Sequence, residues 1–571
     1  MHPETKKSSM KKLKNYLNLN QFLLVLFFSA HQFWAQGNFT GNIESTFQYL
    51  NEDPIISAIQ PPSKGLINSY MNVFYRNGGF KAGMRFESYL PRIQGYPNRF
   101  DGTGIGMRYV GYVNSKVDIT LGSVYEQFGS GLAFRTYEDR ALGYDNVLDG
   151  ARIIFKPFKG VELKGVYGQQ RLTFVSGKIE NASGIVRGLD GEIILNDAIG
   201  KLKSFPLDVV IGGSFVSKYQ RDDDDALILP ENVAAYGGRL KLKYKNWRMD
   251  GEYIRKEQDP SVDNGKIYNY GHAAVVNLGY SKKGIGVSLS AKSADNMSYR
   301  SDRNKQLQDV FINYLPALNK THTYNLVATL YPYATQPLGE VAYQADFLYT
   351  IKKGTPLGGK YGTTFGLNAS TTYQPIRHTS AIDFGDSSRV TYHTGLFDKS
   401  DSLYWRDINA NVTRRINKKL LLIVSYFNIH INNDVAKVSN DASGIIGANI
   451  GVVEASYKIN SKHNIRIELQ GMFVNRKADG SPNDKGDWAT GLIEYTVSPS
   501  YFVSFINQYN YGNPNPQKRV NYPNITCGYI HESTRIMLSY GRQRAGLFCV
   551  GGVCRFVPAN NGLTLSFTQS F

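Results

Sequence analysis

The sequence predicts an all-β fold, a single antiparallel transmembrane β-barrel of about 26 strands, with about 24 strands as the fallback number. Three observations support this prediction. The chain is rich in Tyr, Phe and Gly, with 39, 30 and 56 residues, which favours strands and turns. Apolar and polar residues alternate over segments of about 10 to 14 residues, long enough for a tilted strand to cross a bilayer. The connections between these segments are either short or long, and the two kinds largely alternate.

The alternation has a period of two residues and leaves a charged polar face. In one segment Ile465, Ile467 and Leu469 alternate with Arg466 and Glu468. The pattern recurs at 117–121, 239–244 and 247–253. A soluble β-sandwich also has a polar face, but its strands are usually shorter, at about 5 to 6 residues. The segment length therefore favours a membrane barrel.

The connections predict which side of the membrane each end of the barrel faces. Short connections are found at 77–80, 114–116, 156–160, 245–246, 281–284, 416–419, 460–463, 498–500 and 532–533. Long ones are found at 50–66, 90–101, 126–150, 219–232, 291–320, 376–402, 431–447 and 476–487. Outer-membrane barrels have short periplasmic turns and long external loops, so both termini are expected in the periplasm.

The strand number is expected to be even, because both termini are placed on the same side. Counting gives about 25 alternating segments, and the parity breaks between residues 339 and 403. We therefore expect a missed or irregular strand near 376–402.

Residues 1–36 are interpreted as a signal peptide, and residues 37–571 as the barrel. Five lysines precede the apolar run FLLVLFFSA at 22–30, and Ala35 is a plausible cleavage position. A single membrane anchor is the alternative, but spanning needs about 20 apolar residues and this run has about half that number. The alternating segment GNFTGNIESTFQYL at 37–50 follows directly, so no N-terminal plug domain is expected. Loops 126–150, 291–320 and 376–402 are the expected candidates for blocking the lumen.

The formal net charge of +18 indicates an anionic partner. A cytosolic chain with this charge would suggest nucleic acid. For an exported chain we expect no nucleic acid, and instead the lipids and lipopolysaccharide of the outer membrane, or acidic solutes.

The segment 121–146 contains the candidate lumen contacts Arg135, Glu138, Asp139 and Arg140 among aromatic residues and glycines. Fixed charges near a pore set its ion preference, so one interpretation is a charged constriction or a solute contact. The other interpretation is a well-packed loop that is held by salt bridges.

The sequence KKGTPLGGKYGTT at 352–364 nearly matches a phosphate-binding P-loop. Tyr361 replaces the Ser or Thr of that motif, and a strand pattern follows in place of a helix. A cationic loop with Lys353 and Lys360 as candidate contacts is the preferred interpretation. The acidic run RDDDDA at 221–226 lacks EF-hand spacing and is interpreted as a solvated loop tip in preference to a calcium site.

No enzymatic function, cofactor or metal site is predicted. The chain has neither a GxSxG nor an HExxH motif, and its nine His show no pairing by spacing. Cys549 and Cys554 are a candidate disulfide, which export permits, whereas a metal site would need further ligands. Cys527 is then expected to be a buried or lipid-facing residue.

The C-terminal segment GLTLSFTQSF at 562–571 is expected to be the closing strand, paired with residues 37–50. Leu563, Leu565 and Phe567 are expected to face lipid, and the alternating Thr and Ser residues the lumen. Phe567 and Phe571 are interpreted as the aromatic signal that barrel-insertion machinery recognises, which makes that machinery an expected partner.

Three stretches, 125–146, 354–363 and 541–571, resemble an uncharacterised outer-membrane β-barrel family of the Bacteroidota that is carried as a domain of unknown function. The resemblance implies an outer-membrane barrel and brings no substrate or catalytic residue. Together with the charged polar faces, the sequence predicts a porin-like pore or transport channel for a polar solute. The alternative is a non-conducting scaffold or accessory subunit of an outer-membrane secretion or assembly complex, which would have outer-membrane protein partners.

Overall fold

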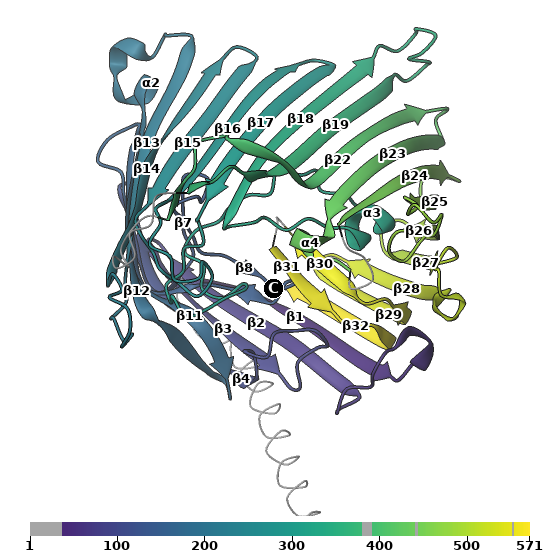
Figure 1. The fold of residues 1–571 in the computed structure, drawn as a ribbon, viewed down its shortest axis with the longest axis horizontal. Helices are drawn as coiled ribbons and strands as arrows, with labels where there is room; N and C mark the ends of the chain where they lie inside the picture. The colour runs from purple at the N-terminus through teal and green to yellow at the C-terminus, as the bar shows by residue number, and fades with distance from the viewer. Residues whose placement is uncertain (1–36, 380–390, 440–443, 551–552) are drawn as a thin grey trace, which may run out of the picture.

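The computed structural model describes residues 37–379, 391–439, 444–550 and 553–571, and they form one closed antiparallel β-barrel (Figure 1). Its sheet has 24 strands, and β1 pairs with both β2 and β32, which closes the sheet on itself. Residues 1–36, the expected signal peptide, lie outside the described residues. Among the described residues, no helix is both long and apolar enough to cross a membrane.

The wall strands are β1 (Asn38–Asn51), β2 (Gly65–Asn77), β3 (Phe80–Tyr89), β4 (Gly102–Val113), β5 (Val117–Val124), β10 (Leu148–Phe155), β11 (Val161–Val175), β12 (Lys178–Ile194), β13 (Leu207–Tyr219), β14 (Asn232–Tyr244), β15 (Trp247–Lys256), β16 (Gly271–Lys282), β17 (Ile285–Asp295), β18 (Gly339–Ile351), β19 (Thr363–Pro375), β22 (Lys399–Arg415), β23 (Leu420–Asn432), β24 (Ile445–Lys458), β25 (His463–Val474), β26 (Trp488–Val497), β27 (Tyr501–Tyr509), β28 (Asn521–His531), β29 (Thr534–Gln543) and β32 (Asn560–Ser570).

The remaining elements lie in the connections. They are η2 (Pro54–Ile56), β6 (Gln127–Phe128), β7 (Phe134–Arg135), β8 (Glu138–Asp139), β9 (Tyr144–Asp145), α2 (Leu195–Ala198), η3 (Gly200–Leu202), α3 (Asn325–Leu330), β20 (His378–Thr379), β21 (Tyr392–His393), α4 (Asn433–Ala436), η4 (Pro516–Lys518), β30 (Gly546–Val550) and β31 (Val553–Val557).

The fallback number of 24 is correct, and the preferred number of 26 is wrong. The extra strand expected near 376–402 is not in the wall, because β19 pairs directly with β22 through pairs such as Thr371↔Arg406. The short strands β20 and β21 pair with each other outside the barrel sheet. Residues 380–390 of that segment lie outside the described residues.

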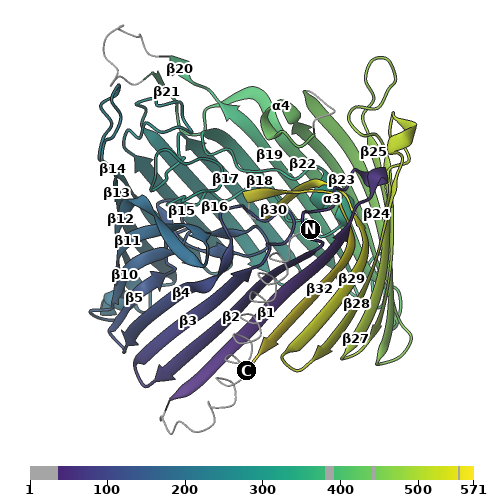
Figure 2. The same ribbon diagram turned by 90° about the horizontal axis from the view of Figure 1, so that it is seen from below.

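The two ends of the barrel differ in their connections. The short connections predicted from the sequence lie at one end, where β1 begins and β32 ends, and we call this the turn end. The predicted long connections lie at the other, the loop end, where Figure 2 shows β20, β21 and α4 opposite the C terminus. Three connections break the length rule: 195–206 and 352–362 at the turn end are long, and 176–177 at the loop end is short.

The closing strand has the register and faces that its alternation predicts. Glu44 of β1 is opposite Thr568, and Phe47 is opposite Leu565. Leu565 is also opposite Leu538 of β29, and both are exposed on the outer face. Residues of a strand alternate between faces, so Thr568 belongs to the inner face.

Candidate functional site

Four long connections at the loop end fold into the barrel, and we call them the inward loops. They are 90–101, 125–147, 296–338 and 544–559. Figure 1 shows α3 and the β30–β31 hairpin, which belong to two of these loops, within the ring of wall strands. Two of the three loops expected to block the lumen, 126–150 and 291–320, thus contribute to the inward loops.

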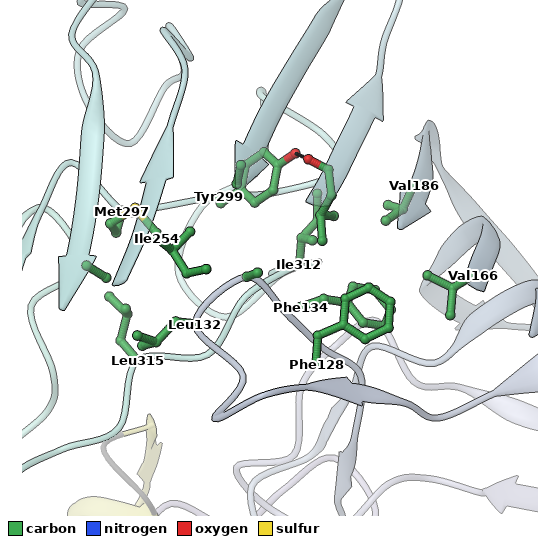
Figure 3. Packing of buried hydrophobic residues seen from close by; sticks show 14 of the residues in the cluster. Phe128, Leu132, Phe134, Val166, Val186, Ile254, Met297, Tyr299, Ile312 and Leu315 are labelled. Carbon is green, nitrogen blue, oxygen red and sulfur yellow. Dashed lines mark hydrogen bonds between the residues drawn. The ribbon is translucent and has the colours of Figure 1, made fainter. Parts of the chain in front are cut away.

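One apolar cluster fixes two of these loops to the wall (Figure 3). Phe128 and Phe134 of loop 125–147 are fully buried together with Val166 of β11 and Val186 of β12. Tyr299 of loop 296–338 is in the same cluster, and its hydroxyl donates to a backbone carbonyl of β14 at 2.8 Å. The inner face of β5 and of β10 to β17 therefore carries apolar residues toward the loop end, beside the buried lysines Lys218, Lys256 and Lys292.

A second apolar cluster attaches the same long loop to a different sector of the wall. Leu326 and Leu330 of α3 are buried with Ile450 of β24 and Met472 of β25. The Leu326 amide also donates to Gln470 Oε1 at 3.0 Å. Loop 296–338 therefore crosses the barrel interior between two parts of the wall.

A buried ion cluster joins loop 125–147 to the wall. Arg85 of β3 donates to Glu87 Oε1 at 2.7 Å, to Glu138 Oε2 at 2.7 Å and to Asp145 Oδ2 at 3.1 Å. Arg171 of β11 donates to both oxygens of Glu87, at 2.9 and 2.7 Å, and to Asp145 Oδ2 at 3.0 Å. Breaking one partner of a buried ion pair is strongly destabilising, so this cluster fixes the loop firmly.

Arg140 extends this cluster to the first strand. It donates to Glu138 Oε1 at 3.0 Å and to Glu44 Oε2 of β1 at 2.7 Å. Burial raises the pKa of the Glu138 carboxyl, and the nearby charges of Arg85 and Arg140 oppose that shift. Glu138 and Arg140 thus have the contacts expected of a loop that is held by salt bridges.

The other predicted residues of this segment lie elsewhere in the loop. The Arg135 guanidinium lies between two rings, 4.4 Å from the Tyr137 centroid and 4.1 Å from the Tyr314 centroid. Asp139 Oδ1 accepts the amide of Leu142 at 3.0 Å, which stabilises the local turn. The structure therefore brings Glu138 and Arg140 together and places Arg135 in an aromatic environment.

Lys353 and Lys360 lie at the other end of the barrel. Both are exposed in connection 352–362 at the turn end, which leads into strand β19. A P-loop needs a helix N-terminus after its glycines, so this connection does not have that geometry. These lysines share no site with Arg135, Glu138, Asp139 or Arg140.

The acidic run 221–226 forms a loop stabilised by its own carboxylates. Asp222 accepts the amides of Asp224 at 3.2 Å and Leu229 at 2.9 Å. Within the described ranges, no group of three His, Cys, Asp or Glu residues is arranged to hold a metal ion.

Toward the turn end, the inner wall is lined by paired charges. Arg239 of β14 donates to Asp190 Oδ1 of β12 at 2.7 Å. Lys241 of β14 donates to Glu192 Oε2 of β12 at 2.9 Å. Similar pairs are Lys81–Asp118, Arg152–Asp118 and Arg466–Glu454, and Lys164 of β11 bonds Glu126 of loop 125–147. Both signs of charge therefore lie on the inner face of β3, β5, β10, β12, β14, β24 and β25, which is the arrangement of a polar lumen.

The β30–β31 hairpin carries the predicted disulfide pair. Cys549 and Cys554 face each other in the hairpin, with Cα atoms 4.0 Å apart and the sulfurs bonded. Arg555 follows and donates to the carbonyl oxygens of Ala141 at 2.7 Å and Gly95 at 2.8 Å, which joins three inward loops. Cys527 lies exposed on the outer face of β28, opposite Val503 and Leu538.

A cavity of about 560 Å³ lies where the inward loops meet. Residues from all four of them line it: Pro97, Arg99, Tyr137, Tyr144, Met297, Leu307, Gln308, Asp309, Phe311, Asn313, Tyr314, Leu315, Ala334, Thr335, Pro337, Val553, Cys554, Arg555 and Phe556. Its size is that of a pocket for a small molecule.

Sequence reasoning did not identify the residues that matter most for this site. Arg85 and Glu87 are two residues apart in KAGMRFESY and therefore lie on the same face of the strand. Two charged residues on one strand face are the sequence pattern that could have predicted the ion cluster. Arg99, Asp309 and Arg555 lie in three different loops, so no local pattern marks them.

The family model described as "Family of unknown function (DUF6029)" matches residues 10–571. No curated protein matches the chain. Among solved structures, the chain is similar to the copper transporter OprC, at 9% identity over 95% of this chain and 81% of that chain, with a TM-score of 0.39. It is also similar to the siderophore receptor PirA from Pseudomonas aeruginosa, at 8% identity over 94% of this chain and 80% of that chain, with a TM-score of 0.39. The outer membrane protein OpdK from Pseudomonas aeruginosa matches at 10% identity over 80% of this chain and 98% of that chain, with a TM-score of 0.30. At these scores the similarities carry no functional argument.

Proposed function

The chain belongs to this family of unknown function, and we propose that it is an outer-membrane channel that passes a polar solute through its charged lumen. The proposal includes no catalytic step. It is supported by the two faces of the barrel wall and by the position of the inward loops.

The outer face supports a membrane location. Large apolar side chains are exposed on it along the strands, such as Leu469, Phe505 and Leu538. In lipid every backbone polar group must be satisfied internally, which a closed antiparallel barrel achieves. We propose the outer membrane as the location, with the turn end and both termini in the periplasm and lipopolysaccharide around the loop end.

The observation that carries the channel proposal is the set of paired charges on the inner wall toward the turn end. Lys241 with Glu192 and Lys81 with Asp118 are paired there and partly exposed to the interior. Charged side chains are costly to bury without pairing and hydrogen bonds, and a water-filled lumen accommodates them. The inward loops occupy the loop end, so passage requires at least one of them to move.

A non-conducting scaffold in a secretion or assembly complex is the second candidate. The observation that favours it is the attachment of loop 296–338 to two sectors of the wall through separate apolar clusters. A loop fixed in this way obstructs passage, and a scaffold needs no passage.

The expected route to the membrane is the barrel-insertion machinery. The Phe571 amide donates to the Gly41 carbonyl oxygen at 2.9 Å, and the Phe571 ring is half exposed at the turn end. An aromatic side chain at this position is accessible for recognition before the barrel closes.

Planar-bilayer recording with the purified full-length barrel tests the proposal. The decisive variant replaces residues 126–146 with a short Gly/Ser turn, because Val124 and Leu148 are already paired across the gap. We expect the wild type to conduct and the variant to conduct more. The matched control replaces residues 222–229, which lie outside the inward loops, and should conduct like the wild type. If neither the wild type nor the first variant conducts, while the wild type co-purifies with fixed outer-membrane partners, the scaffold is correct.

A further inference from the structure

The cavity between the inward loops is open to solvent at its rim. Leu307 and Phe556 both line it, and they are 86% and 58% exposed. The cavity lies at the loop end, so under the proposed orientation it faces the outside of the cell. A solute from the medium can therefore reach it without crossing the barrel.

Five aromatic residues belong to the lining. Tyr137, Tyr144, Phe311, Tyr314 and Phe556 come from three different loops. Aromatic side chains provide flat apolar surface and favour stacked or edge-to-face contact with another ring. This lining fits a ligand with a planar apolar body.

Two of these rings are already fixed in place. The Arg135 guanidinium lies between Tyr137 and Tyr314, at 4.4 and 4.1 Å from their centroids. Cation–π contacts of this geometry restrain ring positions and add positive charge behind the cavity wall. The rings are therefore pre-organised, which lowers the entropic cost of binding.

The charges of the lining are predominantly positive. Arg99 and Arg555 line the cavity, and Asp309 is the carboxylate among the lining residues. Asp309 is paired with Arg99, which leaves the charge of Arg555 uncompensated within the lining. An anionic group on the ligand would complement it.

Two buried polar atoms in the lining lack hydrogen-bond partners among the described residues. They are Arg99 Nε and Thr335 Oγ1. The other side of the Arg99 guanidinium is occupied, since Nη2 donates to the Gly143 carbonyl oxygen at 3.2 Å and Nη1 bonds Asp309. Both atoms are inaccessible to solvent, so a solute in the cavity does not reach them, and Arg555 remains the cation that an anionic group would contact.

We propose that this cavity binds a small planar aromatic molecule that carries a carboxylate. The aromatic body packs among Tyr137, Phe311 and Phe556, and the carboxylate pairs with Arg555. This inference rests on the proposed channel function and deepens it, because it names the class of solute that the inward loops recognise.

Isothermal titration calorimetry of the full-length barrel in detergent tests the proposal with defined probes. The probes are naphthoate, the uncharged naphthamide of the same shape, and cyclohexanecarboxylate, which has the charge without the aromatic ring. We expect naphthoate to bind more tightly than either other probe by about tenfold, since both the ring and the charge contribute. Equal affinities for naphthoate and naphthamide, or for naphthoate and cyclohexanecarboxylate, would overturn the proposal.

Two variants locate the binding site. Arg555→Gln should weaken naphthoate binding by about tenfold, and Phe556→Ala by about fivefold. The controls Arg221→Gln and Phe548→Ala replace the same residue types outside the lining, in loop 220–231 and on β30, and should bind like the wild type. Phe556 is largely exposed, so its variant tests the proposal even if Arg555→Gln fails to fold. Unchanged binding in Phe556→Ala, or in a folded Arg555→Gln barrel, would place the site elsewhere.

The two proposals fail in different ways. If naphthoate binding depends on Arg555 and Phe556 but the barrel does not conduct, the binding site stands and the channel proposal is wrong. Conductance without naphthoate binding would leave the channel and remove this site.

Discussion

Arg140 Nη1 lies 2.7 Å from Glu44 Oε2, which ties an inward loop to the first strand of the barrel wall. Arg140 also bonds Glu138, and Glu138 accepts from Arg85 of β3. The loop 125–147 is thus held by charges from the region where the barrel closes. Its position therefore depends on correct closure, and its release depends on breaking these contacts.

The first prediction concerns the contacts of Arg140 with Glu44 and Glu138. Arg140→Gln removes the bonds to Glu44 and Glu138, and hydrogen bonds to charged groups contribute about 1.5–3 kcal/mol, less where a partner is partly exposed. We expect amide hydrogen exchange in 125–147 to become about tenfold faster, because local opening becomes more favourable. Arg221→Gln is the control, since Arg221 is an exposed residue of another loop. Unchanged exchange in Arg140→Gln would show that apolar packing alone holds the loop.

The second prediction concerns the apolar packing of the same loop. Phe128 is fully buried against the wall, and truncating a buried Phe to Ala costs about 3–5 kcal/mol. We expect Phe128→Ala to increase protease cleavage within 125–147 while the barrel stays folded in a heat-modifiability gel. Leu307→Ala is the control, because Leu307 is 86% exposed and its truncation should leave cleavage of that loop unchanged. Equal cleavage in both variants would contradict the clustered packing.

Much of the wall could be predicted from the sequence, because strand alternation is a local property. The closing strand shows this, since Leu565 and Thr568 lie on the faces that their parity predicts. The strand number was overestimated because an extra wall strand was expected near 376–402, where the short strands β20 and β21 pair only with each other outside the wall. Alternation alone does not tell a wall strand from a loop hairpin.

The candidate site could be predicted only in part, because its contacts are long-range. Glu138 and Arg140 were identified because charged residues are closely spaced in the segment 121–146. Their partners Arg85 and Glu44 are on strands that are distant in the sequence. The apolar inner face toward the loop end was also missed. β23, with the sequence LLLIVSYFNIHIN, shows the reason: its inner residues are apolar where loops cover them, so the alternation is weak there.

The third prediction concerns the outer face. Leu538 is exposed on the lipid-facing side of β29, while the next residue, Ser539, is on the inner side, where its Oγ lies 2.8 Å from Thr526 Oγ1. Arginine on the lipid face of a barrel near the midplane costs about 2–4 kcal/mol. We expect Leu538→Arg to lower the unfolding free energy of the barrel in liposomes by about that amount. Ser539→Arg should have a much smaller effect, and equal losses would contradict the assigned faces.

The fourth prediction concerns the register of closure. Phe47 is directly opposite Leu565, and Leu563 is two residues away along β32. Directly opposite Cα atoms are about 4.5–5.5 Å apart, within disulfide range, whereas the diagonal distance of about 7–8 Å is not. In a Cys527→Ala background, the pair Phe47→Cys and Leu565→Cys should cross-link efficiently on oxidation. The pair Phe47→Cys and Leu563→Cys is the matched control, and preferential cross-linking of that pair would show a different register.

The fifth prediction concerns orientation in the membrane. Cys549 and Cys554 lie in the β30–β31 hairpin at the loop end, whereas Lys353 lies at the turn end. If the loop end faces outward, an impermeant thiol reagent should label Cys549 and Cys554 on intact cells once the disulfide is reduced. A cysteine introduced by Lys353→Cys should be labelled only after the outer membrane is breached, which makes it the control for reagent leakage. Peptide mass spectrometry separates both signals from Cys527 on the outer face. Labelling of position 353 on intact cells, with Cys549 and Cys554 protected until breach, would reverse the proposed orientation and place the cavity of the inward loops in the periplasm.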